Sequence, residues 1–178
     1  PESFDAGELE AFLSQRYGFQ TAFRRPDTLK GMIDGVKIDC IAHKYAYLRQ
    51  PYAESGIRLY SIEDIVAMKL SAIADDGSRL KDFVDIACLS TRIPFYEMLK
   101  CYERKFPQAN VIRPFKALTY FDDIDFGEDI VMLNFEYDWK QIARRLKEMT
   151  VRQEHIFSQW PLKEQKRPVA EDKDMTSM

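Results

Sequence analysis

Long apolar runs are absent from this chain of 178 residues, and neither sign of charge dominates it. No stretch approaches the roughly 18 apolar residues of a membrane span, so the sequence predicts no membrane segment. A charged start followed by a short apolar core, typical of a signal peptide, is also missing, so we expect a cytoplasmic location. The formal net charge of −3 argues against a general nucleic-acid-coating surface but leaves a local basic patch possible.

Cysteine is scarce, and this scarcity limits the kinds of site that the chain can carry. Cys40, Cys88 and Cys101 are odd in number and far apart, and no C-x-x-C pair occurs. Neither a zinc site nor a disulfide framework is therefore expected, and small buried thiols in a reducing cytoplasm fit better. The two histidines, His43 and His155, are isolated, and we interpret them as structural or surface residues.

Apolar residues are nevertheless sufficient for a core, since they make up 46% of the chain and aromatic residues 13%. Asp34-Gly35, between two β-like runs, predicts a tight hairpin. Residues 45–57 and the acidic stretch 120–129 resemble loops. Residues 110–119 predict a short helix interrupted near Pro114. The remaining expected elements are helices at 5–17, 61–74, 79–91, 94–105 and 138–151 and strands at 19–25, 28–34 and 36–44.

This order of elements predicts an α+β fold, in which a small antiparallel or mixed sheet precedes a C-terminal helical bundle. Residues 1–58 would form the smaller α/β portion. Residues 59–155 would form the bundle. The polar residues 156–178 predict a disordered tail.

A lysine interrupts the apolar face of the helix expected over residues 61–74. Helical periodicity places Lys69 within the stripe formed by Ile62, Ile65 and Ile73. A lysine is almost never fully buried without a partner. The sequence therefore predicts an acidic partner or an anionic ligand for Lys69.

Two carboxylates interrupt the next helix in the same way. Residues 79–90 are apolar around almost the whole circumference, which is typical of a buried helix. Asp82 and Asp85, three residues apart, share one narrow strip of it. Positions equidistant from the turn of an antiparallel helical hairpin face each other, so Lys69 should lie level with Asp82 and within reach of Asp85. The alternative to a working site is a buried structural ion pair, which would leave Lys69 enclosed.

Asp39 is the other candidate. It lies within a strand-like run, V-K-I-D-C-I, although aspartate is depleted in strands. Alternation places it on one face with Lys37 and Ile41. A carboxylate projecting beside a lysine–carboxylate pair could hold a divalent cation and a nucleotide phosphate together. The alternative is a solvated aspartate on the exposed face of an edge strand.

Residues 56–89 resemble the signature segment of the AbiEii/AbiGii-type nucleotidyltransferase toxins, the toxin half of type IV toxin–antitoxin systems. The family pattern is S-x-E-D-h-x-A-x-K followed by R-x-x-D-h-x-D. Its lysine, its arginine and the two aspartates of its second part correspond here to Lys69, Arg79, Asp82 and Asp85. The runs GVKIDCI, ERKFPQ and ALTYFDD also look like family sequence, in the right order. The resemblance covers roughly residues 4–150, and it implies that residues 1–58 are a partial nucleotidyltransferase-like α/β portion.

Through this resemblance we expect a Mg²⁺-dependent transfer of a nucleotide from a nucleoside triphosphate to an acceptor such as tRNA. Lys69, Asp82 and Asp85 would be catalytic, Lys69 and Arg79 would bind phosphate, and Asp39 would be a metal or base carboxylate. An antitoxin protein is the expected macromolecular partner.

The sequence departs from the family at one point. The superfamily's first motif, a glycine turn followed by an Asp-x-Asp strand, does not precede Asp39. We therefore expect a truncated or degenerate form, with weak or no catalysis by these residues alone. The alternative function is a catalytically dead interaction module that binds an antitoxin or a partner subunit.

Overall fold

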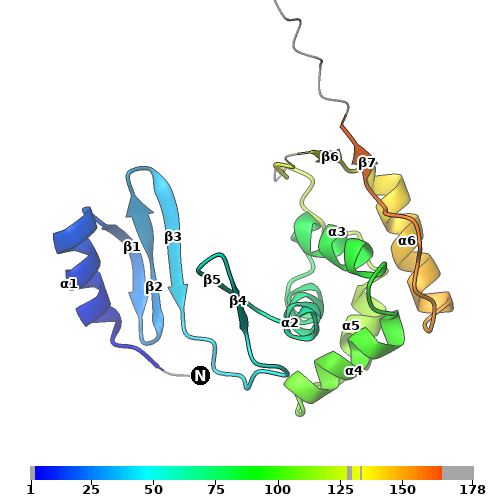
Figure 1. The fold of residues 1–178 in the computed structure, drawn as a ribbon, viewed down its shortest axis with the longest axis horizontal. Coiled ribbons are helices and arrows are strands. Elements are labelled where there is room, and N and C mark those ends of the chain that lie inside the picture. The colour runs from blue at the N-terminus through cyan, green and yellow to red at the C-terminus, as the bar shows by residue number, and fades with distance from the viewer. Residues whose placement is uncertain (1–2, 128–129, 133, 166–178) are drawn as a thin grey trace, which may run out of the picture. The chain divides into compact units, whose positions relative to one another are not determined.

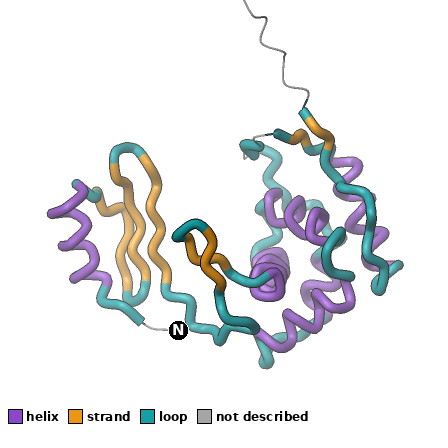
Figure 2. Tube along the Cα trace, viewed as in Figure 1, coloured by secondary structure: helices purple, strands orange, loops and turns teal. Residues whose placement is uncertain are grey.

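The computed structural model describes residues 3–127, 130–132 and 134–165 (Figure 1). Its contacts divide the chain into two compact units, Pro1–Ala46 and Tyr47–Met178. Helices and small antiparallel sheets make up both units (Figure 2), which confirms the predicted α+β class. No helix of the described residues is long and apolar enough to cross a membrane.

The first unit packs one helix against a three-stranded antiparallel sheet of order β1-β2-β3. Asp5 caps the helix, because its side chain accepts hydrogen bonds from the first backbone N–H groups. The predicted Asp34-Gly35 hairpin is present, with both residues at positive φ (49° and 77°). The elements are α1 (Ala6–Tyr17), β1 (Gln20–Arg25), β2 (Thr28–Ile33) and β3 (Val36–Ile41).

The small core of this unit forms where α1 meets the central strand. Ala6, Phe19 and Leu29 are buried there. Gly31 allows the close approach, because a Cβ atom at that position would lie 2.2 Å from the carbonyl oxygen of Gln20 and 2.5 Å from the Phe19 ring.

The second unit is a helical bundle with two small sheets of two strands each. Its core joins side chains of α2, α3, α4 and α6, including the fully buried Leu70, Phe83, Met98 and Leu146. The elements are β4 (Tyr52–Glu54), β5 (Ile57–Leu59), α2 (Ile62–Asp75), α3 (Leu80–Leu89), α4 (Phe95–Lys105), α5 (Ile112–Ala117), β6 (Phe135–Glu136), α6 (Trp139–Val151) and β7 (Lys163–Glu164).

Two local predictions for this unit are corrected. The stretch expected to be a loop at 45–57 contains β4, and its turn to β5 is made by Ser55 and Gly56, both at positive φ. Helix α5 is not interrupted by Pro114, which is its third residue. A proline is tolerated in the first turn, because the N–H that it removes would have no partner within the helix.

The boundaries of the parts also differ from those expected. The contacts separate the units after Ala46 rather than after residue 58, because the backbone N–H groups of Leu48 and Arg49 are bound by Asp64 on α2. Part of the segment expected to be a disordered tail is ordered. Phe157 is buried in the core, and β7 pairs with β6. Residues 166–178 of that predicted tail lie outside the described part.

Candidate functional site

The helical hairpin of α2 and α3 brings Lys69 to the two carboxylates expected for it. Lys69 Nζ lies 2.6 Å from Asp82 Oδ1 and 2.5 Å from Asp85 Oδ2. Ser61 caps the start of α2, and Gly77, at φ 71°, supports the turn between the helices. The register inferred from the distances to the turn is therefore confirmed.

The three side chains of this ion-pair cluster differ in their exposure to solvent. The Asp82 side chain is 3% exposed, that of Lys69 25% and that of Asp85 47%. The ammonium group thus contacts a buried carboxylate on one side and a solvent-accessible one on the other. The alternative of a structural ion pair predicted an enclosed lysine with no cleft beside it; the Lys69 side chain is partly exposed, so the first of these two expectations is not met.

The Lys69 ammonium stays charged in this setting. Burial alone would lower its pKa, but hydrogen bonds and charge interactions with Asp82 and Asp85 outweigh burial and raise the pKa above its ordinary value of 10.5. A protonated lysine with two carboxylate neighbours can exchange the exposed one for a phosphate oxygen, because phosphate offers the same negative oxygen ligands.

Arg79, the residue directly before α3, adds a second cation beside Asp82. Its Nε atom lies 3.5 Å from Asp82 Oδ2, and its side chain is 49% exposed. The backbone here is held by a bridge to Asp125, whose N–H donates to the carbonyl of Ser78 at 2.8 Å. Two cations therefore flank the buried Asp82.

Asp39 belongs to the first unit and has cationic neighbours of its own. It lies on β3, an edge strand, directly opposite Lys30 of β2. Its Oδ2 atom is 3.8 Å from Lys30 Nζ and 3.9 Å from Lys37 Nζ. Ile38 and Cys40 pack against the core, so the expected alternation of faces is confirmed. Within its own unit, Asp39 matches the alternative of an aspartate on the exposed face of an edge strand.

Nucleotidyltransferases generally use a divalent metal ion, which acidic side chains would have to hold. Among residues 3–127, 130–132 and 134–165, no group of three or more His, Cys, Asp or Glu could hold a metal ion. Asp39 lies beside two lysines, and Asp82 and Asp85 share Lys69. These carboxylates do not fit a Mg²⁺ site, because their neighbours are already cations.

The sequence interpretation missed one polar pair. Asp64 Oδ1 accepts a hydrogen bond from Lys105 Nζ at 2.6 Å, and both side chains are completely buried. Asp64 also exchanges hydrogen bonds with Ser61 in the capping box at the start of α2. The signal was present in α4, where Lys105 continues the apolar face of Met98 and Tyr102. The test that identified Lys69 would have identified Lys105.

Asp64 is also the most strongly perturbed carboxylate of the unit. Burial alone would raise its pKa, but hydrogen bonds from Lys105 and Ser61 and from two backbone N–H groups lower the pKa from 3.8 to about 2. The pair fixes the start of α2 to the end of α4 and to residues 48 and 49. It therefore sets the position of the helix that carries Lys69.

The sequence of this chain matches the profile of a known protein family. Residues 33–161 match the profile of the nucleotidyl transferase AbiEii toxin family of type IV toxin–antitoxin systems. The match spans more than half of the chain and includes Asp39, the hairpin and Lys105. This chain therefore belongs to that family, as its sequence motifs predicted. Membership supports a nucleotidyltransferase-like role in toxin–antitoxin or abortive-infection systems.

A curated relative is an uncharacterized protein of Aquifex aeolicus (strain VF5), 27% identical over 148 residues, which cover 81% of this chain and 70% of the relative. No solved structure matches the chain.

Proposed function

We propose that this chain is a nucleotidyltransferase-like toxin component in which the α2–α3 hairpin binds the phosphates of a nucleoside triphosphate. The acceptor is an RNA such as tRNA, and the regulatory partner is an antitoxin protein. The observation that carries the proposal is Lys69, a charged lysine on the apolar face of α2 that contacts one buried and one exposed carboxylate.

The residues divide into separate roles by their exposure. Asp82 is a positioning residue, because it is buried and holds the ammonium group of Lys69 toward solvent. Asp85 is the exchangeable contact, since a phosphate oxygen can replace it without leaving a buried charge unpaired. Arg79 supplies a second cation for the triphosphate.

The proposed reaction joins a hydroxyl oxygen of the acceptor to the α-phosphorus of the triphosphate and releases pyrophosphate. Lys69 and Arg79 stabilise the negative charge that moves onto the leaving group. Asp39 remains a proposed base carboxylate, and Mg²⁺ remains the ion implied by the family resemblance. We expect transfer to be slow, because no described group of three acidic or other metal-binding residues is available for the ion.

The test measures incorporation of label from an α-³²P nucleoside triphosphate into total tRNA by the wild-type chain and its variants. Lys69→Ala should reduce incorporation by at least about a hundredfold, the range for removing one transition-state charge contact. Lys116→Ala, an exposed lysine of α5, is the matched control and should leave incorporation unchanged. Undiminished transfer by Lys69→Ala would reject the assignment.

The absence of a metal-binding group among the described residues favours a second candidate, a catalytically inactive module that binds an antitoxin or partner subunit. This candidate predicts no incorporation by the wild-type chain at any Mg²⁺ concentration. It also predicts that the cognate antitoxin binds wild type and Lys69→Ala equally in calorimetry. Wild-type incorporation that is lost with Lys69→Ala would reject it.

A further inference from the structure

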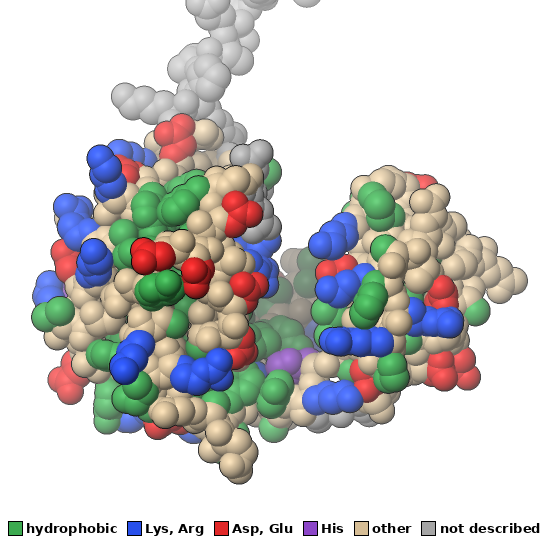
Figure 3. Space-filling view, turned by 180° about the vertical axis from the view of Figure 1, so that it is seen from behind, with side chains coloured by type: hydrophobic (Ala, Val, Ile, Leu, Met, Phe, Trp, Pro, Cys, Tyr) green, Lys and Arg blue, Asp and Glu red, His purple; other side chains and the backbone are tan. Residues whose placement is uncertain are grey.

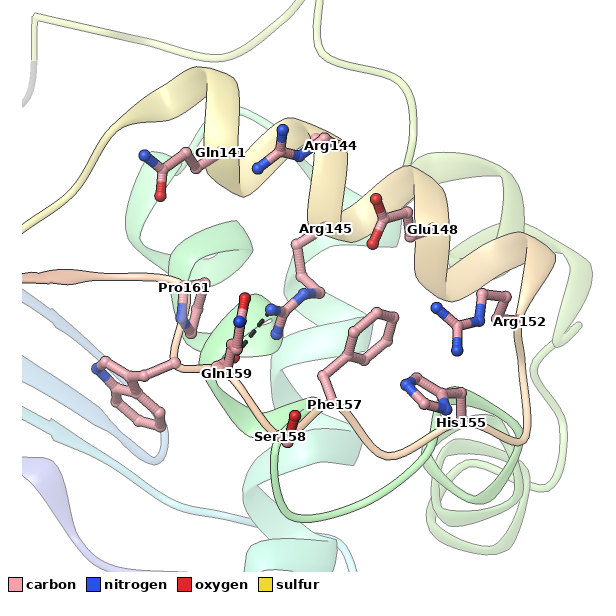
Figure 4. Close-up of a pocket in the computed structure, with 11 residues that line it drawn as sticks. Gln141, Arg144, Arg145, Glu148, Arg152, His155, Phe157, Ser158, Gln159 and Pro161 are labelled. Atoms are coloured by element: carbon pink, nitrogen blue, oxygen red, sulfur yellow. Dashed lines mark hydrogen bonds between the residues drawn. The ribbon is translucent and has the colours of Figure 1, made fainter.

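A second polar site lies in the same unit, between α6 and the segment that follows it. Here residues 152–161 turn back along the helix and enclose a pocket of about 320 Å³ (Figure 4). Its lining includes Arg144, Arg145 and Arg152 together with the aromatic residues Phe157 and Trp160. In the space-filling view, Lys and Arg side chains gather along the edge of this unit that α6 forms (Figure 3).

The charge in this pocket is strongly unbalanced. Its lining contributes three arginines but only one carboxylate, Glu148. In the part of the chain that the structure describes, neither Arg144 nor Arg152 forms an ion pair, and both are exposed. Among the described residues, these guanidinium groups therefore have no paired anion, although the whole chain carries a net charge of −3.

Arg145 has a different role from its two neighbours. It donates hydrogen bonds to Ser90 Oγ at 2.9 Å and to the carbonyl oxygen of Gln159 at 2.8 Å. Its guanidinium group lies 4.2 Å from the centre of the Phe157 ring, which is buried beneath it. Arg145 thus fixes the 152–161 segment to α6 and to the end of α3. The shape of the pocket is therefore held by contacts within the fold.

We propose that this pocket binds a phosphodiester group of a single-stranded nucleic acid, with an adjacent base stacked on Trp160. Guanidinium groups match phosphate by paired hydrogen bonds, which favours phosphate over a simple point charge. The volume lies at the low end of the usual range for ligand sites, about 300–1,000 Å³, and suits one phosphate with part of its sugar.

The aromatic neighbour argues for a polynucleotide rather than free phosphate. Trp160 is 46% exposed at the pocket and has Phe135 beside it at a ring distance of 6.4 Å. Cationic grooves next to exposed aromatic rings are how proteins bind single strands without reading their sequence. This inference rests on the proposed function. It extends that function by giving the acceptor strand a binding site on α6.

The experiment measures binding of a short fluorescein-labelled oligouridylate by fluorescence anisotropy, without any nucleoside triphosphate. The double substitution Arg144→Gln/Arg152→Gln should weaken binding by at least about tenfold. It should also reduce the slope of log K against log salt concentration by about 1.4, the value for two lost contacts to a single strand. Trp160→Ala should weaken binding by about fivefold or more while leaving the salt slope unchanged.

The matched control is Arg16→Gln/Arg58→Gln, which removes the same charge at two exposed positions outside the pocket. It should retain wild-type affinity and slope. Equal loss in the control, or an unchanged slope in the pocket variant, would overturn the inference. The strand-binding measurement contains no nucleoside triphosphate, so failure of the transfer reaction and failure of strand binding can be distinguished.

Discussion

Asp64 and Lys105, which are 41 residues apart, meet at 2.6 Å with both side chains excluded from solvent. Lys105→Met should leave the Asp64 carboxylate buried without its cation and lower the free energy of unfolding by about 3–5 kcal/mol. Urea unfolding followed by circular dichroism would measure this change. Lys100→Met, on the same helix but exposed beside Glu97, should leave the unfolding midpoint nearly unchanged. Equal midpoints for Lys105→Met and wild type would contradict the importance of the pair.

The same carboxylate predicts how stability depends on acid. The pKa of Asp64 is about 2 in the folded chain and close to 3.8 when unfolded, so its contribution is fully present above pH 4. As the pH falls toward 2, about 2 kcal/mol of stability should be lost, since each pKa unit corresponds to about 1.4 kcal/mol.

The variant for this test is Asp64→Asn, which cannot titrate. Its deficit relative to wild type in urea unfolding should be largest at pH 5 and smaller at pH 2.5. A deficit that stays constant over this range would show that Asp64 keeps an ordinary pKa.

Gly31 should be intolerant of even one added carbon. In Gly31→Ala, the new Cβ would overlap the carbonyl oxygen of Gln20 and the ring of Phe19, so strands β1 and β2 must separate locally. Overpacking of this kind costs about 1–3 kcal/mol. Hydrogen exchange should show faster exchange of amides in residues 20–33. Met32→Ala, which truncates an exposed side chain on the same strand, should not have this effect.

Two of the thiols should react slowly. Burial, with a smaller contribution from the nearby Asp85 charge, raises the pKa of Cys88 to about 12, and burial also raises the pKa of Cys101. Because the thiolate is the reactive form, iodoacetamide at pH 8 should modify both much more slowly in the native chain than in urea. Peptide mass spectrometry would measure each rate. Native Cys88 reacting at its unfolded rate would contradict this environment.

The fold and the hairpin could be predicted largely because their determinants are local. The Lys69–Asp82–Asp85 contact follows from helical periodicity and distance to a turn, both of which depend on neighbouring residues. The Asp34-Gly35 hairpin follows from turn chemistry. The β4–β5 hairpin was missed, although Ser55-Gly56 makes a similar turn, because strands of only three residues carry little alternation.

Long-range partners could not be predicted in the same way. The spacing within α4 marks Lys105 as anomalous, but nothing in the sequence states that its partner is Asp64 on α2. Alternation placed Asp39 on the correct face of β3, but its lysine neighbour Lys30 comes from the adjacent strand. The arginine pocket depends on how residues 152–161 fold back, and residues 156–161 belong to the stretch for which the sequence predicted disorder.

In the proposed reaction, the α2–α3 hairpin binds the phosphates of the nucleoside triphosphate. The most direct measurement compares labelling of RNA from α-³²P and γ-³²P nucleoside triphosphate by the wild-type chain and Lys69→Ala. Wild type should transfer only the α label, and Lys69→Ala should transfer neither. Transfer of the γ label, or α labelling that is independent of Lys69, would contradict the proposed reaction.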